Sequence, residues 1–339
     1  MKRRYQFRKI VRRIIISLII LSLMLGVMVS TAGAVRTFIN FGGSNPGGSW
    51  FTMAGGMAPL LTKQIKNLNV TPVATGGSAD NNRLLRRGEL DTCLSHSLTA
   101  YDNWNGVGLF KGEGPFKSIR MFCAVYESWH HFVVLDKSSI RTISDLKGKR
   151  VAVGPAGSGS AVNSENILRA LDLWDKIKVE HLDFDAAGRA LTDGHVDALT
   201  QSSAPMPNVV TAAATHKLRF IVLNDQEFDT VIAKYPYYKK SIMPAGTYEA
   251  WQKDYLCIAF AVYWVAHKEL PAKWAYEMLK VAFDPENANY LARVHVQWTT
   301  LDPGLEGMKA LGIPLHPGAV KFWKEKGLSI STELIPPEM

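Results

Sequence analysis

Short apolar runs alternate with helix-like patterns along most of this chain, and this alternation limits the folds that it can adopt. The strand-like runs lie at 37–41, 70–74, 92–95, 119–126, 132–135, 150–154, 179–183, 198–201, 218–223 and 257–265. Strands separated by helices are typical of α/β folds with parallel sheets. We therefore expect parallel sheets covered by helices, in a chain long enough for two lobes.

Three connections between these elements are rich in glycine and serine. They lie at 42–49, 75–78 and 154–160, and each follows a strand-like run and precedes a helical pattern. Glycine allows backbone N–H groups to approach a ligand, hydroxyl groups add donors, and the following helix N-terminus carries a partial positive charge. Ligands of open α/β sheets bind beyond the carboxyl ends of the strands. The sequence therefore predicts a cleft that binds an anion.

The first 34 residues have the pattern of an export signal. A basic segment at 2–13 holds seven Lys and Arg residues, an apolar segment follows at 14–29, and Ala32-Gly33-Ala34 forms an A-x-A cleavage site. We expect cleavage near Ala34 and a periplasmic location for the mature protein. Two alternatives stay open: retention of the segment as a membrane anchor, and twin-arginine export through Arg3-Arg4 instead of the general secretory route.

The net charge of the chain is concentrated in this segment. Its removal leaves about +2 of the formal charge of +9. The remaining basic residues Arg83, Arg86 and Arg87 recur at helical spacing, which is typical of a solvated helix face. We therefore expect no nucleic-acid partner.

The sequence contains no recognisable metal or cofactor motif. Cys93, Cys123 and Cys257 allow at most one disulfide bond within the chain, and the first two lie in apolar runs where a free thiol packs as a small core residue. Cys-x-x-Cys and His-x-x-x-His pairs do not occur, and the adjacent His130 and His131 point to opposite faces of a strand. We expect buried thiols, no metal and no cofactor.

Enzyme motifs are also missing from the glycine- and serine-rich loops. The pattern Gly-x-Ser-x-Gly does not occur around Ser44, Ser78 or Ser158, and the phosphate-binding pattern Gly-x-x-x-x-Gly-Lys-Ser/Thr does not occur. We expect a protein that is not an enzyme, with a secreted hydrolase as a distant alternative.

Three stretches together resemble the TAXI family, the solute-binding receptors of one branch of tripartite ATP-independent periplasmic (TRAP) transporters. They are TGGSADNNRLLRRGELD at 75–91, DLKGKRVAVGPAGSGS at 145–160 and GIPLHPGAVKFWKEKG at 312–327. The second stretch is shared by many two-lobed binding proteins, and the other two narrow the match. The similarity extends over almost the whole mature chain.

The resemblance implies a type II-like periplasmic binding protein with two α/β lobes, joined by hinge strands, that close over a ligand. The first lobe would combine 35–127 with 255–339, and the second would be 128–254. Such a receptor captures a small organic anion, such as glutamate, a dicarboxylate or a 2-oxo acid, and delivers it to TRAP permease subunits as a monomer. Receptors for an ABC importer or a sensor kinase remain alternatives, as does an envelope protein that binds no ligand.

The loops and the resemblance together place the ligand against residues of both lobes. Candidates in the first lobe are Ser44, Asn45, Trp50, Thr75, Ser78, Asn81, His96 and Ser97. Candidates at the hinge and in the second lobe are Trp129, Ser158, Gly159, Ser160, Asn163 and Ala204.

Several candidates have an equally local interpretation. Trp50 fits an aromatic wall of the cleft or a core position, and Ser78 fits a ligand donor or a helix N-cap. His96, which can donate from both nitrogens when protonated, stands where the family commonly has glutamine. Trp129 replaces a small residue or proline, and would narrow the pocket or stack against it. The stretch 201–205 is expected to line the same cleft, although its serines individually fit a strand-to-helix turn slightly better.

The candidate donors of the second lobe give the first testable prediction. Ser160→Ala should weaken anion binding by about 1 to 3 kcal/mol, because a site built from hydroxyls and amides loses one donor among several. Ser202→Ala should change the affinity little. Titration of each variant with the bound solute checks this, and a reversed result would place the contact on the other loop.

Overall fold

The computed structural model describes residues 37–235 and 237–339, so the expected signal segment and its cleavage site lie outside the described residues. The strands are β1 (Thr37–Gly42), β2 (Leu68–Val73), β3 (Thr92–His96), β4 (Ile119–Leu135), β5 (Arg150–Ala152), β6 (Lys178–Glu180), β7 (Ala198–Gln201), β8 (Leu218–Ile221), β9 (Lys239–Met243) and β10 (Tyr255–His267). The strand-like runs seen in the sequence correspond to all of these except β9, which the sequence analysis missed.

Helices follow most of the strands. They are α2 (Ser49–Gln64), α3 (Ser78–Arg86), α4 (Ser97–Asn105), α5 (Gly159–Ala170), α6 (Phe184–Thr192), α7 (Pro207–Ala213), α8 (Asp225–Lys234), α9 (Ala272–Ala282), α10 (Ala288–Val294), α11 (Leu305–Leu311) and α12 (Pro317–Glu325). Short 3₁₀ turns lie at Gly108–Phe110, Ile143–Leu146, Trp174–Lys176, Pro285–Asn287, Val296–Thr300 and Thr332–Leu334.

The strands form one connected sheet in the order β2-β1-β3-β10-β4-β7-β5-β6, with β9 beside β10 and β8 beside β4. We call the part around β2, β1 and β3 the first lobe, and the part around β7, β5 and β6 the second lobe. Pairs within each lobe, such as β1 with β3 and β5 with β7, are parallel. β10 runs antiparallel to β3 and β4, and β4 runs antiparallel to β7 and β8. The sheet is therefore mixed: parallel pairs occur within the lobes, as expected, and the pairs that β4 and β10 make are antiparallel.

The long strand β4 is one of two strands that connect the lobes; the other is β10. The runs at 119–126 and 132–135, expected to be separate strands, form the continuous β4. Its first half pairs with β10 and its last residues pair with β7 and β8. Near the middle it carries Ser128, His130 and His131, which are buried but polar. The predicted lobe boundary between 127 and 128 falls inside this strand.

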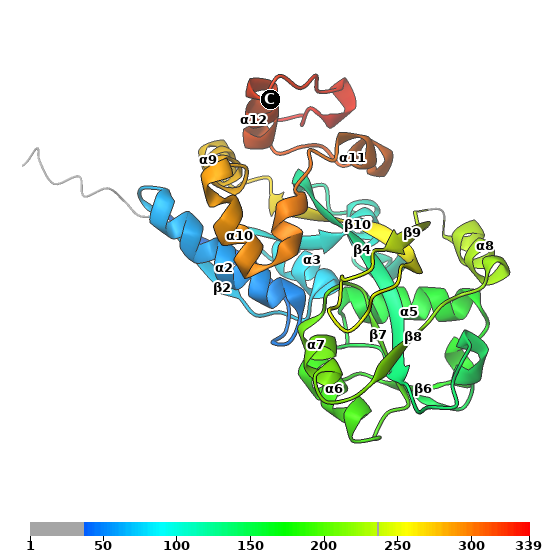
Figure 1. Ribbon diagram of the computed structural model, residues 1–339. Coiled ribbons are helices and arrows are strands. Elements are labelled where there is room, and N and C mark those ends of the chain that lie inside the picture. Colours follow the sequence, from blue (N-terminus) through cyan, green and yellow to red (C-terminus); the bar gives the residue numbers. More distant parts are fainter. Residues whose placement is uncertain (1–36, 236) are drawn as a thin grey trace, which may run out of the picture. The chain divides into compact units, whose positions relative to one another are not determined.

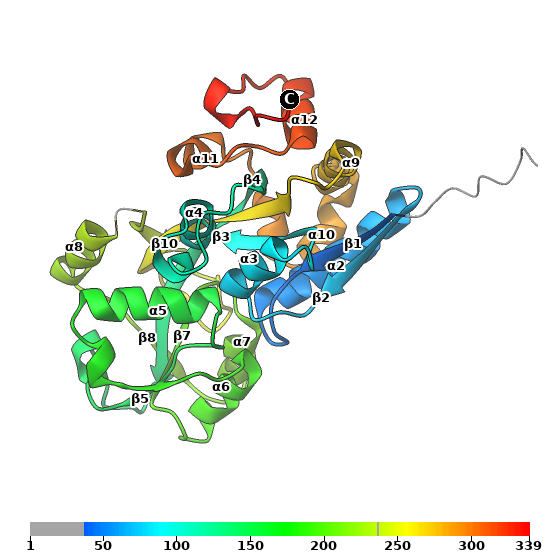
Figure 2. The same ribbon diagram turned by 180° about the vertical axis from the view of Figure 1, so that it is seen from behind.

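Each lobe has its own apolar core. The first centres on Trp264 of β10, which stacks on Phe41 with ring centroids 5.3 Å apart and packs edge-on against Trp298. In the second lobe, separate clusters around Phe132 and Phe220 cover the two faces of the sheet. Helices α2, α9 and α10 pack together in the first lobe, whereas α6 and α7 pack together in the second (Figures 1 and 2).

An ion pair holds the exposed chain end against a buried arginine, and the three cysteines lie in the cores of the two lobes. Arg120, which is 2% exposed, donates from Nε and Nη2 to the two carboxylate oxygens of Glu338, each at 2.7 Å. Cys93, Cys123 and Cys257 are buried and free, as expected for packed thiols. Within the part of the chain that the structure describes, no helix is both long and apolar enough to cross a bilayer.

Buried neutral histidines make stability depend on pH. Burial lowers the pKa of His131 to about 4, although a bond to the Trp129 carbonyl partly opposes this shift, and burial likewise lowers the pKa of His295 and His316 to about 4. The unfolded chain binds protons at these residues below about pH 6.5, while the folded chain does not. Stability should therefore be complete above about pH 6.5 and decrease as the pH falls toward 4. Asp102 has the opposite effect on stability. Burial raises its pKa to about 6, so its contribution is lost as the pH rises through that value.

We expect each such histidine to lower the free energy of unfolding by about 1 kcal/mol at pH 5.5 relative to pH 7.5. Urea unfolding at the two pH values measures this effect. His131→Gln should reduce the difference between them by about that amount, whereas the exposed His195→Gln should not. An unchanged difference in His131→Gln would contradict the prediction.

Candidate functional site

Three helices from two lobes begin at one cavity. Gly48 and Gly77 precede α2 and α3 in the first lobe, and Ser158 precedes α5 in the second. These are the three glycine- and serine-rich loops that the sequence identified. Because each helix N-terminus carries a partial positive charge, their convergence favours a negative ligand group.

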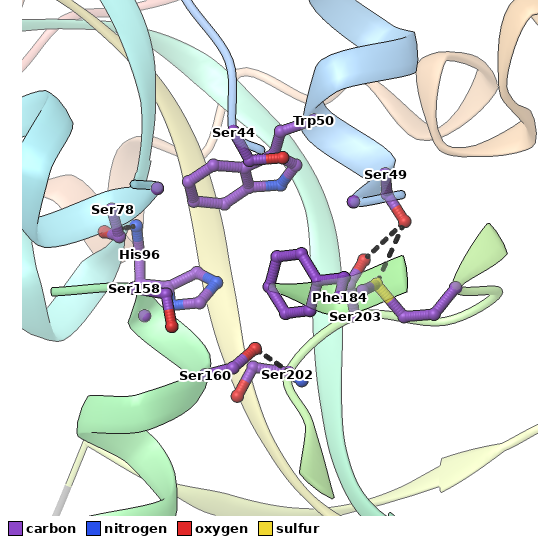
Figure 3. A pocket seen from close by; sticks show the side chains of 14 residues that line it. Ser44, Ser49, Trp50, Ser78, His96, Ser158, Ser160, Phe184, Ser202 and Ser203 are labelled. Carbon is purple, nitrogen blue, oxygen red and sulfur yellow. Dashed lines mark hydrogen bonds between the residues drawn. The ribbon is translucent and has the colours of Figure 1, made fainter. Parts of the chain in front are cut away.

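The cavity is small and lined by hydroxyls, glycines and rings. Its volume is about 30 Å³, measured as the space open to the centre of a water molecule. Its lining residues are Ser44, Gly48, Ser49, Trp50, Gly77, Ser78, His96, Ser158, Gly159, Ser160, Phe184, Ser202, Ser203 and Met206. Figure 3 shows the rings of Trp50, His96 and Phe184 turned toward the same space.

Trp50 is a wall of the cavity and is also tied to the second lobe. Its indole Nε1 donates to the hydroxyl of Tyr126 at 2.7 Å, and that hydroxyl lies 3.0 Å from Oγ of Ser203. Its ring packs edge-on against His96, with centroids 4.9 Å apart. The core and wall interpretations of Trp50 thus coexist, since the residue is only 5% exposed and still lines the cavity.

His96 is neutral, and its Nδ1 atom is held by the side chain of Asn163. Burial lowers its pKa to about 3, so the cationic donor considered in the sequence analysis does not exist at neutral pH in this conformation. Nδ1 lies 3.2 Å from the amide nitrogen of Asn163. That amide is oriented by its own contacts, because Nδ2 donates to the Gly159 carbonyl at 2.8 Å and Oδ1 accepts from Tyr238 at 2.6 Å.

The serine hydroxyls are partly engaged with the backbone. Ser158 is the N-cap of α5 and accepts from the Ala161 amide at 3.1 Å. Ser78 accepts from the His96 amide at 2.9 Å and is the first residue of α3, whose N-cap is Gly77. The N-cap interpretation of Ser78 is therefore wrong. Ser160 accepts from the Ser202 amide at 3.2 Å, which joins two loops of the second lobe.

The two lobes touch around the cavity. Asn45 Nδ2 donates to Asp183 Oδ1 at 3.0 Å, and Ser49 Oγ donates to the Pro205 carbonyl at 3.0 Å. Gln297 Nε2 donates to the Ala204 carbonyl at 2.6 Å. These contacts describe a closed cleft, in which residues of both lobes surround one small space.

Half of the candidate residues line the cavity and half do not. The structure brings together Ser44, Trp50, Ser78, His96, Ser158, Gly159 and Ser160. It leaves Asn45, Thr75, Asn81, Ser97, Trp129, Asn163 and Ala204 outside the lining.

Most of the residues outside the lining support the residues that form it. Thr75 donates to the Gly43 carbonyl, and Asn81 donates to the carbonyls of Gly43 and Leu94. Ser97 is the buried first residue of α4 and Asn163 positions His96. Trp129 packs against the core around Phe220. The expectation that this indole narrows the pocket is therefore wrong, because β4 directs it toward the second core.

The candidate set omitted Gly48, Ser49, Gly77, Phe184, Ser202, Ser203 and Met206. The stretch 201–205 was expected to line the cleft, and Ser202 and Ser203 do so. Ser202 Oγ lies 2.8 Å from His130 Nδ1, a contact that engages its hydroxyl within the protein. No sequence signal pointed to Phe184 or Met206, since both are single apolar residues near loops.

Comparison with known proteins gives the family. A model of the NMT1-like family matches residues 41–327, so the chain belongs to this family. The expected two-lobed α/β architecture is confirmed by the strand order and the separate cores. The narrower resemblance to TAXI receptors is not what the match shows.

Solved structures with which the chain aligns are remote in sequence. One is a putative L-cystine ABC transporter from Listeria monocytogenes, at 15% identity over 78% of this chain and 96% of that chain, with a TM-score of 0.49. Another is the alkanesulfonate-binding protein SsuA from Xanthomonas axonopodis pv. citri bound to MOPS. It aligns at 14% identity over 90% of this chain and 98% of that chain, with a TM-score of 0.47. The GluR0 ligand-binding core from Nostoc punctiforme in complex with L-glutamate aligns at 13% identity over 77% and 98%, with a TM-score of 0.45.

The close approach of the two lobes depends on Gly159. A Cβ at this position would lie 2.2 Å from Nδ1 of His96 and 3.1 Å from Cβ of Ser78. Gly159→Ala should therefore lower the free energy of unfolding by about 1 to 3 kcal/mol. Gly55→Ala within α2 is the matched control, because a Cβ there meets nothing within 4 Å, and it should be neutral or stabilising by up to about 1 kcal/mol. Equal stability of the two variants in urea would show that the lobes do not meet this way.

Proposed function

We propose that this member of the NMT1-like family is an extracytoplasmic solute-binding receptor that captures a small organic anion and delivers it to a membrane permease. The observation that carries the proposal is the cavity at which helices α2, α3 and α5 begin. Its hydroxyl groups and helix N-termini suit an anionic group. The family's relation to substrate-binding proteins favours binding over catalysis.

Hinge closure is the proposed means of capture. A ligand favours the closed form only through contacts that the open form does not offer. Ser78 and His96 of the first lobe and Ser158 and Ser160 of the second lobe line one cavity, so a solute there would contact both lobes. We expect the motion to occur about the crossing strands β4 and β10. The first lobe would comprise 35–127 and 255–339, and the second lobe 128–254.

The partner that we propose is the permease of an ABC importer. An aligned structure is described as a putative L-cystine ABC transporter, which supports this partner better than the TRAP permease implied by the TAXI resemblance. A sensor kinase that reads the closed receptor is a further candidate. We propose that the receptor acts as a monomer outside the cytoplasmic membrane.

Thermal unfolding with a panel of solutes tests the receptor function. The mature protein is refolded to remove carried ligand and is then heated with amino acids, mono- and dicarboxylates, oxo acids and sulfonates. A bound solute at about one hundred times its dissociation constant should add roughly 2.7 kcal/mol, which raises Tm by a few degrees.

Two serine variants provide the control. Ser160→Leu places a larger side chain in the cavity and should abolish the shift, whereas Ser329→Leu on the exposed surface should retain it. The absence of a shift with every solute class, from a protein that unfolds cooperatively, would overturn the receptor function.

A further inference from the structure

We propose that the cavity selects a small organic acid with one compact acid group and no ammonium group, and that the imidazole of His96 donates one hydrogen bond to this ligand. This inference rests on the proposed receptor function and narrows its ligand class. It separates monocarboxylates from the amino acids and dicarboxylates that a receptor of this kind could also take.

The lining of the cavity carries no formal charge. Among the described residues, no Lys, Arg, Asp or Glu side chain lines it, and its polar side chains are seven serines and His96. An ammonium group would therefore have no carboxylate partner there. It would also lie at the positive ends of α2, α3 and α5, where a cation is disfavoured.

His96 supplies the one side-chain donor with a fixed direction. The amide nitrogen of Asn163 can only donate, so Nδ1 of His96 accepts from it and the ring proton is on Nε2. His96 is 4% exposed, lines the cavity, and has no hydrogen-bond partner for Nε2 among the described residues. Edge-on packing against Trp50 and Phe260 keeps the ring in this orientation. The imidazole thus presents a neutral N–H group to an acceptor on the ligand.

The volume of the cavity limits the size of the acid group that it can hold. A volume of about 30 Å³ accommodates the centres of about two or three water molecules. One compact acid group fills this space, whereas a second carboxylate would require a further set of donors. The apolar surfaces of Trp50, Phe184 and Met206 suit a carbon chain better than an inorganic oxyanion.

Two acidic residues, Asp183 and Asp185, stand next to a lining residue but do not themselves line the cavity. Asp183 and Asp185 flank the lining residue Phe184, and both are exposed. Asp183 accepts from Asn45, and Asp185 lies against Gly47 of the first loop. These carboxylates contact the first lobe next to the lining residues Ser44 and Gly48, and they disfavour additional negative charge on a ligand that extends toward them.

Calorimetric titration of the refolded wild-type protein with matched solutes tests the inference. Pyruvate, lactate and alanine share a three-carbon carboxylate and differ at the second carbon, which carries an oxo, hydroxyl or ammonium group. Succinate and glutamate add the second carboxylate, and sulfate and phosphate represent inorganic anions. We expect pyruvate or lactate to bind at least tenfold more tightly than alanine, succinate and glutamate.

Each outcome has a distinct meaning. Tightest binding of alanine, glutamate or succinate would overturn this inference and leave the receptor function intact. Tightest binding of sulfate or phosphate would overturn the organic part of the ligand assignment. Failure of every solute to bind would overturn the receptor function itself.

Substitution of His96 tests the donor separately. His96→Phe keeps an aromatic ring beside Trp50 but removes the N–H group, whereas His96→Gln keeps an amide donor. We expect at least a tenfold loss of affinity for the monocarboxylate in His96→Phe, and a smaller loss in His96→Gln. Equal affinities in two variants that unfold cooperatively would show that His96 donates nothing to the ligand.

Discussion

The antiparallel pairing of β4 with β10 is the constraint on which the rest of the structure depends. The pairing runs from His267 opposite Ile119 to Ile258 opposite His130, with register shifts at Val262/Tyr263 and Trp264/Val265, so two paired strands pass through both lobes. An unpaired backbone group in such a buried strand would cost free energy, so the pair cannot separate when the lobes move. Any relative motion of the lobes must therefore bend or twist this pair.

The residues of β4 suit a strand that passes through both lobes. Its two ends are apolar and pack into separate cores, whereas Ser128, His130 and His131 occupy the stretch between them. Their polar atoms bond to the second lobe: Ser128 to the Ser202 carbonyl, His130 to Ser202 Oγ and His131 to Tyr248. A buried polar group is tolerated only when it is hydrogen-bonded. These bonds therefore fix the loop 201–205 against the strand that both lobes share.

The sequence predicted the three loops because their signals are local. Glycine, serine and a following helical pattern identify an α/β turn without any knowledge of distant contacts, and Ser44, Ser78 and Ser158 all reached the cavity. The antiparallel direction of β4 and β10 could not be predicted, since strand direction depends on which strands pair across a long chain separation. Trp129 and Asn163 were misplaced for a similar reason. Their side-chain directions follow from the register of β4 and the rotation of α5, which composition does not specify.

The bond from Trp50 through Tyr126 to Ser203 joins one wall of the cavity to the opposite lobe. The shape of the binding space is therefore a property of the closed arrangement, and neither lobe alone contains it. A solute that meets one lobe would encounter only part of this recognition surface. Discrimination between solutes should then reside in how long the closed complex lasts, with encounter rates varying far less.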